Sequence, residues 1–524
     1  MPPMNRSSVR LLVGLFAQLC CIATLAATPT HDAIDQSARR AMEAFNAPGI
    51  TVSVVHDGEL YYARGYGVAE TGKSKGIDDQ TLFHIGSVSK AFTAASLAML
   101  ADEGRLAWDD PVIDYLPEFR MHDAWVTREF TIRDLLTHRS GLPLGAGDLL
   151  MFPEADSTVA DIIHGLRYLQ PSTSFRSEFA YDNLLYIVAG EVVARVSGMP
   201  FEAFLEERLL KPLGMGACAA TASRAPHRAV LATPHMLVDG ELQVSGTGMT
   251  DLVAAAGGIV CGSRHMANWM SFILNEGVTA DGERLISEQQ YAELIRPITL
   301  RATPGVMAEF AGSYVTAYAL GWGVSTFYGQ PMLSHSGGVL GMTTYLVLLP
   351  KQKLAVFVSN NQMSSAATAL GIDIVDQFLR DTSPGYGQDW IGLFSSANQD
   401  RQSAADEVVT QAWASRNADS RPSLPLDAYA GTYRDDWYGD IRIALEDGRL
   451  WFYSERSKPL QGPMEHFQYD TFVARWTDRR LLADAYVSFT LSPEGTVERI
   501  RMKAESPATD FSFDFHDLDL RRVE

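Results

Sequence analysis

Hydrophobic and polar positions change their period several times along the chain. Residues 31–45 have the 3.6-residue period of an amphipathic helix. Residues 50–55 are an apolar run rich in β-branched residues, and residues 59–67 are a return segment with three tyrosines. Between them lies Asp57-Gly58, a pair typical of tight turns. The pattern therefore predicts a helix followed by a β-hairpin near the N-terminus.

The middle of the chain is mostly helical, and strands return after it. An apolar helix is predicted from residue 91 to about 104, and residues 105–300 read as helices joined by many loops. Short β-rich runs follow, separated by glycine and by Pro-Lys-Gln, and we expect strands at 318–327, 332–336, 342–349 and 354–359. Because hairpins connect these runs, we predict an α+β fold in which the early hairpin and the late strands form one antiparallel sheet flanked by helices, with a large helical insertion.

The C-terminal part has a different style. Residues 362–415 read as helical, and 416–425, rich in polar residues and proline, as a linker. Residues 426–524 predict a small all-β barrel or sandwich, with strands expected at 429–433, 441–445, 450–453, 472–475, 486–491, 497–503 and 511–515. Its aromatic residues Trp437, Tyr438 and Trp451 are expected to fill a barrel rather than to form a ligand site.

The first 27 residues have the layout of a signal peptide. Arg6 and Arg10 precede an apolar run at 11–22, and small residues follow at 23–27. The run is short for a membrane span, although an uncleaved anchor is the alternative. We therefore expect an exported protein, periplasmic or secreted, with no membrane attachment after cleavage.

Charge and cysteine content narrow the classes of partner. The formal charge of −20 argues against nucleic acid as a partner and gives no support for an anionic membrane surface. Export leaves Cys218 and Cys261, which either pair in an oxidising compartment or act as two small buried residues. Neither belongs to a cluster with metal-ligand spacing, so we predict no metal and no cofactor.

The first chemical motif is Ser87-Val-Ser-Lys90 at the start of the apolar helix. Residues three apart share one face of a helix, so the Ser87 hydroxyl and the Lys90 amine can meet. A serine becomes a nucleophile when a base takes its proton, and a buried lysine of lowered pKa is such a base. The motif alone is weak, because a helix-capping Ser87 and a surface Lys90 are the commoner explanation of an isolated serine and lysine at this spacing.

Two further motifs follow in the chain. Tyr181-Asp182-Asn183 lies at a loop-to-helix boundary, where a phenol can shuttle a proton and Asn183 can position a substrate amide. The plain alternative is a core tyrosine beside a capping asparagine. A classical triad from His138 and Ser140 fails, because the two residues share one turn.

The third motif, His335-Ser-Gly337-Gly338, ends a predicted strand. Glycines there allow a substrate backbone to approach the strand edge, and the Gly338 N–H can complete an oxyanion hole with the N–H of Ser87. A turn with a surface histidine is the alternative.

With the three motifs in this order, the chain resembles the serine β-lactamase and penicillin-binding-protein superfamily, in the branch of class C β-lactamases, D-aminopeptidases and esterases. The resemblance covers roughly residues 31–380 and includes Phe83-His-Ile-Gly-Ser-Val-Ser-Lys90 and Leu135-Leu-Thr-His-Arg-Ser-Gly-Leu-Pro143. It implies a hydrolase domain at 28–415. The segment at 426–524 resembles the lipocalin-like domain of some peptidases of this family.

The resemblance implies a role for each site residue. Ser87 is the implied nucleophile and Lys90 its base, and Tyr181 is implied to protonate the leaving group and to activate water for deacylation. The implied binding residues are Asn183, His335, Gly337 and Gly338. Many relatives have lysine in place of His335, and a neutral histidine holds a substrate carboxylate more weakly.

We therefore predict an exported serine hydrolase that forms an acyl-enzyme with short peptides or amides. An esterase or a β-lactamase is the alternative within the family, and a non-catalytic sensor of peptides or penicillin is the alternative from another class. The sequence gives neither the substrate nor the oligomeric state.

Overall fold

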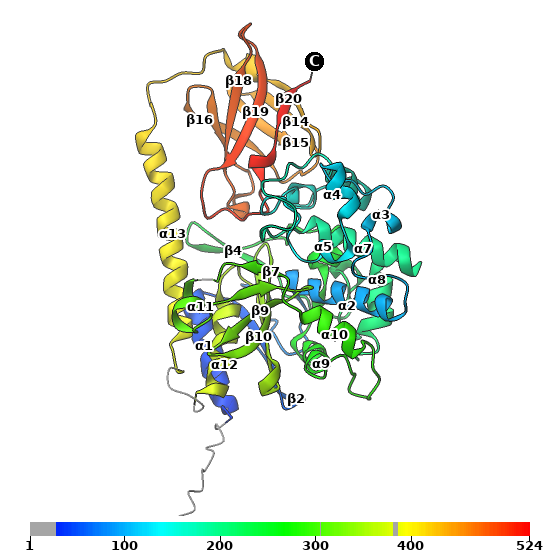
Figure 1. Cartoon of the computed structure of the whole chain (residues 1–524). Coiled ribbons are helices and arrows are strands. Elements are labelled where there is room, and N and C mark those ends of the chain that lie inside the picture. The colour runs from blue at the N-terminus through cyan, green and yellow to red at the C-terminus, as the bar shows by residue number, and fades with distance from the viewer. Residues whose placement is uncertain (1–27, 304, 381–385, 524) are drawn as a thin grey trace, which may run out of the picture.

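The computed structural model describes residues 28–303, 305–380 and 386–523. The predicted signal peptide, residues 1–27, lies outside the described residues. Figure 1 shows a large domain of helices around a sheet and a smaller β-domain stacked on one end of it. The long helix α13 (Trp390–Ser415) runs along one side of the large domain toward the smaller one, and residues 416–425 contain no helix or strand.

One antiparallel sheet of eight strands forms the centre of the large domain. Ile50 pairs with Asn360 and His56 with Leu354, so the N-terminal hairpin joins the strands from the other end of the domain, as predicted. In spatial order the strands are β2 (Glu59–Gly67), β1 (Gly49–His56), β12 (Leu354–Asn360), β11 (Met342–Leu349), β10 (Gln330–Val339), β9 (Gly323–Phe327), β8 (Thr316–Tyr318) and β7 (Thr299–Arg301).

Helices cover both faces of this sheet, so its inner strands are apolar on both sides. In β12, Val356 and Val358 pack against α1 (His31–Phe45) and α12 (Ala366–Leu379), whereas Ala355 and Phe357 belong to the core on the opposite face. The expectation of an antiparallel sheet flanked by helices is confirmed.

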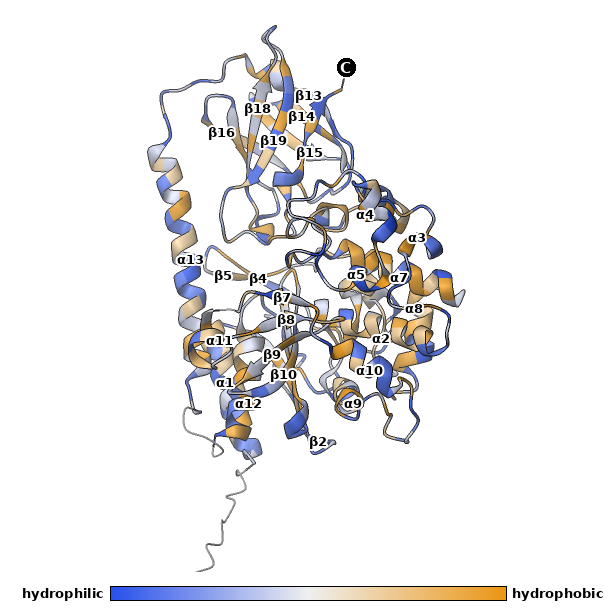
Figure 2. Ribbon diagram, viewed as in Figure 1, coloured by the Kyte–Doolittle hydropathy of each residue, from blue (hydrophilic) through white to orange (hydrophobic). Residues whose placement is uncertain are grey.

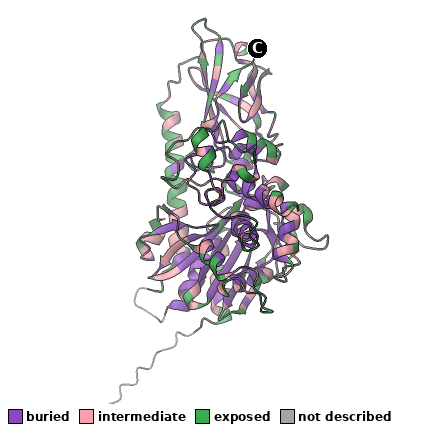
Figure 3. Ribbon diagram, turned by 45° about the vertical axis from the view of Figure 1, so that its right-hand side comes forward, coloured by how far each residue is buried: buried purple, intermediate pink, exposed green. Residues whose placement is uncertain are grey.

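The helix α2 (Ser89–Asp102) lies at the centre of the second face. Every residue from Ser89 to Leu100 is buried, which explains why its sequence is apolar all round. Between the sheet and the outer helices, Figure 2 shows an interior rich in hydrophobic residues, in orange, and Figure 3 shows it as buried, in purple. The surrounding helices are α3 (Val112–Tyr115), α4 (Ala124–Glu129), α5 (Ile132–Leu135), α6 (Val159–Gly165), α7 (Leu184–Ser197), α8 (Phe201–Phe204), α9 (Ser263–Leu274) and α10 (Glu288–Ile295). The helix α11 (Gly305–Phe310) packs instead against the core on the face of α1 and α12.

The C-terminal domain is a closed barrel of eight strands, consistent with the lipocalin-like expectation. Trp437 and Tyr438 are buried, but Trp451 is half-buried and stacks on Tyr453, so Trp451 does not fill the barrel as predicted. The strands are β13 (Gly431–Asp435), β14 (Gly439–Glu446), β15 (Arg449–Ser454), β16 (Gln461–Gln468), β17 (Thr471–Ala474), β18 (Ala485–Leu491), β19 (Val497–Ala504) and β20 (Leu520–Arg522).

The prediction of a strand at 511–515 is wrong. This segment is irregular, and β20 closes the barrel instead by pairing with β13 and β19. The alternating sequence Phe-Ser-Phe-Asp-Phe has the period of a strand, but Ser512 and Asp514 make their hydrogen bonds to the large domain. Contacts between the two domains therefore decide the local structure.

Two strand boundaries also differ from prediction. The run at 318–327 is divided between β8 and β9, with a break that contains Gly321 at φ 78°. The strand β10 extends to Val339 and so includes both Gly337 and Gly338. In the part of the chain that the structure describes, no single helix is long and apolar enough to cross a membrane, although α7 with Phe201–Leu210 meets the criterion as a pair bent by 75°.

A disulfide joins Cys218 to Cys261, which settles the alternative that the sequence left open. Cys261 lies in the short strand β6 (Val260–Cys261), which pairs with β3 (Phe83–His84) three residues before Ser87. The bond therefore anchors the segment that enters α2.

Replacing both cysteines by alanine is expected to lower the free energy of unfolding by about 2–4 kcal/mol, because the bond closes a loop across a sequence separation of 43 residues. Urea unfolding of the oxidised protein and of the Cys218→Ala/Cys261→Ala variant measures the difference. Wild-type protein kept in reductant serves as the control and is expected to match the variant. Two free thiols in the native, unreduced protein would contradict the bond.

Candidate active site

Ser87 lies in the tight turn Gly86–Val88 that leads into α2, and its side chain is half-buried. Gly86 has φ 52°, and a Cβ built on it would lie 2.6 Å from the backbone N of Gly338. A larger residue would therefore strain the backbone and collide with β10. The close approach places Ser87 directly beside the strand that carries the third motif.

Lys90 is completely buried, and its Nζ faces three oxygen atoms. The Nζ atom lies 3.1 Å from Ser87 Oγ, 2.7 Å from Asn183 Oδ1 and 2.7 Å from the carbonyl oxygen of Ala256. Burial lowers the Lys90 pKa to about 7, against the carboxylates of Asp148 and Asp182, which raise it. A neutral amine has two N–H groups for the asparagine and the carbonyl, so its lone pair is left facing Ser87.

Asn183 connects Lys90 to a buried carboxyl group that sequence analysis missed. Its Nδ2 donates to Asp148 Oδ2 at 2.8 Å, while its Oδ1 accepts from Lys90. An ionised carboxylate only accepts hydrogen bonds, so Asp148 fixes which end of the asparagine amide faces the lysine. The signal in the sequence was a single aspartate within the apolar run Gly147-Asp-Leu-Leu150.

Tyr181 presents a buried hydroxyl with no hydrogen-bond partner among the described residues. Lys90 Nζ lies 4.8 Å from the centroid of its ring, beneath the phenol. Burial raises the pKa of Tyr181 well above its usual value, whereas the neighbouring Ser87 lowers it. Tyr181 is therefore a neutral proton donor at pH 7, and a buried donor without a partner is suited to receive a substrate atom.

His138 packs against the ring of Tyr181 and was also missed as a site residue. Its ring lies 4.2 Å from the Tyr181 ring, between centroids, and its Nδ1 accepts the N–H of Asp182 at 3.1 Å. Burial lowers the pKa of His138 well below its usual value, so the ring is neutral. Ser140 instead accepts the N–H of Leu142, which leaves the two residues without the contact of a catalytic dyad.

His335 is held by both ring nitrogens. Nδ1 lies 2.7 Å from the carbonyl oxygen of Ser336, which only accepts, so Nδ1 donates and Nε2 accepts from the hydroxyl of Tyr318 at 2.7 Å. Burial and the charge of Lys90 lower the His335 pKa to about 3. His335 is therefore neutral and supplies no fixed positive charge.

Gly337 and Gly338 occupy opposite sides of β10. A Cβ on Gly337 would lie 1.9 Å from the carbonyl oxygen of Ile85, whereas one on Gly338 would meet nothing within 4 Å. Gly337 thus allows the strand to touch the turn before Ser87, and Gly338 faces the open side with the exposed Ser336. The Ser336 hydroxyl, missed by sequence analysis, is available there to a substrate.

Arg301 is a second cation near the site. Its Cζ lies 5.6 Å from the centroid of the Phe179 ring, and its guanidinium makes no hydrogen bond or ion pair with the described residues. Burial is the main influence on the pKa values of Tyr181 and His335, and the Arg301 charge lowers both. No sequence pattern indicated Arg301 as a site residue. It lies on β7, which comes near β10 only because both strands belong to the same sheet.

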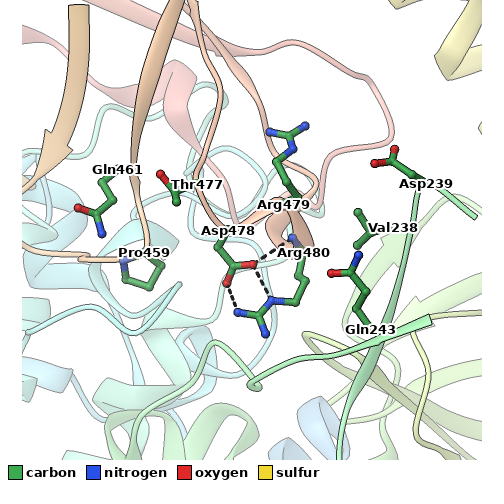
Figure 4. Close-up of a pocket in the computed structure, with 9 residues that line it drawn as sticks. All are labelled: Val238, Asp239, Gln243, Pro459, Gln461, Thr477, Asp478, Arg479 and Arg480. Atoms are coloured by element: carbon green, nitrogen blue, oxygen red, sulfur yellow. Dashed lines mark hydrogen bonds and ion pairs between the residues drawn. The ribbon is translucent and has the colours of Figure 1, made fainter. Parts of the chain in front are cut away.

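A separate groove of about 470 Å³ lies between the hairpin of β4 (His235–Val238) and β5 (Glu241–Val244) and the barrel (Figure 4). None of its lining residues belongs to the Ser87 cluster. Its two arginines are already paired, since Arg480 binds Asp478 and Arg479 binds Asp484. The lining residues therefore offer no unpaired cation to a ligand.

The structure brings together all the residues that the three motifs suggested. Hydrogen bonds join Lys90 to Ser87 and Asn183, and the Lys90 amine lies against the face of the Tyr181 ring. The two glycines of β10 lie against the turn that contains Ser87. Across the described residues, no group of three or more histidine, cysteine, aspartate or glutamate side chains has the arrangement of a metal site.

Family comparisons separate the large domain from the barrel, as the structure does. A family model described as Beta-lactamase matches residues 34–377, and a second, described as a domain of unknown function (DUF3471), matches residues 415–522. The chain is 27% identical to Unguisins hydrolase ungD' of Aspergillus campestris over 495 residues, covering 89% of this chain and 88% of the relative. It is 26% identical to Penicillin-binding protein 4 of Amycolatopsis lactamdurans, over 64% of this chain and 85% of the relative.

Solved structures share the fold at low identity. The octameric penicillin-binding protein homologue from Pyrococcus abyssi matches 93% of this chain and 99% of its own with a TM-score of 0.59 and 19% identity. The class C beta lactamase from Rhodobacter sphaeroides matches 67% of this chain and 99% of its own, with a TM-score of 0.54 and 20% identity.

Proposed function

The chain belongs to the beta-lactamase family, and from that premise we propose that it is an exported serine hydrolase that cleaves short peptides or amides through an acyl-enzyme. The observation that carries the proposal is the contact of 3.1 Å between Lys90 Nζ and Ser87 Oγ, in which the lysine is buried and its other partners are acceptors. This arrangement supplies a serine nucleophile and, in Lys90, a base whose lowered pKa suits proton transfer near neutral pH.

Acylation follows from this geometry. Lys90 takes the Ser87 proton as Oγ forms a bond to the substrate carbonyl carbon, and the carbonyl electrons move to its oxygen. The N–H groups of Ser87 and Gly338 stabilise that oxyanion. When the oxyanion collapses, the C–N bond breaks and the leaving nitrogen takes the proton of Tyr181. The Lys90 ammonium beneath the ring then returns a proton to the tyrosinate, so the pair is neutral again.

Deacylation uses the same residues with water as the nucleophile. Burial raises the Tyr181 pKa well above its usual value, so we assign the activation of water to the neutral Lys90 rather than to the tyrosine. Lys90 accepts the proton of the attacking water as the water oxygen bonds to the acyl carbon. The ester bond to Ser87 breaks, and Oγ recovers a proton from the lysine. No group outside the described site is needed to balance the protons.

The neutral His335 supports amides and peptides over substrates that need a cation at this position. The name of the fungal relative, Unguisins hydrolase, supports a hydrolase. An esterase or a β-lactamase remains the alternative within the family, and the unpaired Arg301 is the residue on which a carboxylate-bearing substrate would depend. Parallel assays on short L- and D-peptides, their C-terminal amides, p-nitrophenyl esters and nitrocefin separate these classes.

Export is proposed from the first 27 residues and gains support from the disulfide between Cys218 and Cys261, because such bonds persist in oxidising compartments. N-terminal sequencing of the protein recovered from the periplasm or medium tests it. Cleavage close to residue 27 is expected, and a full-length N-terminus in the cytoplasm would refute export.

A fluorophosphonate probe tests the catalytic proposal without knowledge of the substrate. We expect covalent labelling of Ser87 at near-stoichiometric levels, identified by peptide mass spectrometry, because the probe reacts with an activated serine hydroxyl. The Ser87→Ala variant is expected to remain unlabelled, and Ser89→Ala is a neighbouring serine control that retains Ser87. Absence of labelling in the folded wild type would overturn the proposal.

The same experiment separates an enzyme from a sensor. An enzyme is expected to turn over at least one amide or ester in the panel, with a rate that Ser87→Ala abolishes. A penicillin label that forms on Ser87 and never hydrolyses, together with no turnover of the panel, would favour the sensor.

A further inference from the structure

The barrel sends one segment into the large domain. Residues 505–514, between β19 and the short helix Phe515–Asp517, run without helix or strand beside the loop that contains Gly147. The two carboxyl oxygens of Asp514 accept the N–H groups of Gly147 at 2.6 Å and Leu149 at 3.0 Å. These bonds fix the backbone on both sides of Asp148 from the barrel.

The same segment approaches the catalytic tyrosine. The Phe511 ring lies edge-on to the Tyr181 ring, with 5.9 Å between centroids. A Cβ on Gly145 would lie 2.7 Å from the carbonyl oxygen of Phe511, and the N–H of Gly145 donates to the carbonyl of Tyr181 at 2.9 Å. The barrel therefore packs directly against the loop that holds the phenol.

Ser512 reaches furthest into the site. Its Oγ donates to Asp148 Oδ2 at 2.8 Å, and the same oxygen accepts from Asn183 Nδ2 at 2.8 Å. Ser512 is 5% exposed and Asp148 0%, so water does not compete for these bonds. A continuous series of contacts therefore runs from Ser512 through Asp148 and Asn183 to the Nζ of Lys90.

We propose that Ser512 of the barrel is a positioning residue for the catalytic base, acting through Asp148 and Asn183 on Lys90. The inference rests on the proposed function, because it assumes that Lys90 is the base. It assigns a positioning role to a residue of the segment 415–522, which the family comparison describes only as a domain of unknown function. The large domain alone would keep the Asn183 amide as a donor to Asp148 but would lack the second donor, the Ser512 hydroxyl.

The charges around the series define the sign of the effect. Burial raises the pKa of Asp148 well above its usual value, while the hydrogen bonds from Asn183 and Ser512 lower it. The Asp148 carboxylate in turn raises the pKa of Lys90. Without the Ser512 hydroxyl, the carboxylate is less stable, and the Lys90 pKa falls.

Other titratable groups face the same atoms and stay in place in the variant. Asp182 raises the pKa of both Lys90 and Asp148, and Asp514 faces Asp148. Asp510 accepts the N–H of Ser512 at 2.9 Å, a backbone bond that Ser512→Ala retains. Burial keeps His138 and His335 neutral. The remaining neighbours of the lysine are the rings of Tyr181 and Tyr186, at 4.8 and 5.1 Å from Nζ to the ring centroids.

The test measures the pH dependence of fluorophosphonate labelling in the full-length protein. For Ser512→Ala, we expect the midpoint of the acid limb to fall by roughly half a pH unit or more, because the Asp148 charge is less stabilised. We also expect the plateau rate to fall about tenfold, because the Asn183 amide is held less firmly. A merely structural role would lower the amount of active protein without moving the midpoint.

Three variants sharpen the result. Ser512→Thr retains a hydroxyl and is expected to restore the wild-type midpoint. Ser506→Ala removes a hydroxyl from the same segment, one that binds only the N–H of Ala508 in the described part of the chain, and is expected to match wild type. Asp148→Asn removes the charge itself and is expected to move the midpoint in the same direction as Ser512→Ala. It therefore tests the series of contacts from Asp148 to Lys90 even if Ser512→Ala fails to fold.

The outcomes of the two proposals are distinguishable. A wild-type midpoint and plateau in folded Ser512→Ala, or an unmoved midpoint in Asp148→Asn, would overturn the positioning role while Ser87 labelling stands. If wild type and Ser87→Ala label equally, the proposed function fails first, and with it the inference that rests on it.

Discussion

The Lys90→Arg variant is expected to hydrolyse its substrate about 10³–10⁴ times more slowly than wild type, which is the scale of losing a general base. Arginine retains a positive charge but stays protonated throughout the working pH range, so it has no lone pair for the Ser87 proton. The two acceptors that now bind a neutral amine, Asn183 Oδ1 and the Ala256 carbonyl, would bind the guanidinium instead. Steady-state kcat/KM or the fluorophosphonate labelling rate measures the loss.

The pH dependence gives the same prediction a second readout. Because burial lowers the Lys90 pKa to about 7, the fraction of neutral base rises as pH rises through 7. We expect kcat/KM of wild type to fall about tenfold per unit below that pH and to level off above it. The exposed Lys351→Arg variant is the matched control and should keep the wild-type profile. A rate that is flat between pH 5 and 8, or a fully active Lys90→Arg, would show that another group is the base.

The sequence predicted the parts of the site that depend on local geometry. The contact between Ser87 and Lys90 follows from the helical spacing of three residues, because the helical turn Gly86–Val88 continues directly into α2 at Ser89. The strands of the sheet were predictable from β-branched runs and turn signals. The pairing of Ile50 with Asn360 joins the early hairpin to the late strands, as those patterns predicted. Both kinds of inference need only short-range information.

The parts that were missed depend on contacts between segments that are far apart in the chain. Asp148 and Ser512 are 364 residues apart, and neither has a local pattern that indicates a partner. The segment 511–515 was assigned to a strand because its alternation fits one, yet its polar side chains bind the large domain. Period-two patterning reports which residues alternate, but it does not report which surface the alternate residues meet.

The Gly337→Ala variant is expected to reduce kcat/KM by about 10²–10³, the scale of losing an oxyanion-hole donor, while the protein still folds. A Cβ at this position would lie 1.9 Å from the Ile85 carbonyl oxygen and 3.2 Å from Gly86 Cα, so β10 must move away from the turn before Ser87. That movement separates the N–H of Gly338 from the N–H of Ser87, although neither donor is removed. The rate loss would therefore arise from the distance between two intact groups.

The neighbouring Gly338→Ala variant is the matched control on the same strand. Its Cβ would meet nothing within 4 Å and its N–H is retained, so we expect a loss of less than tenfold. Thermal unfolding of both variants, measured beside kcat/KM, separates a change in the site from a change in stability. Equal activities for the two variants would mean that the contact between β10 and Ile85 does not set the oxyanion hole. A large difference at similar melting temperature would mean that the strand acts by its distance from the turn of Ser87.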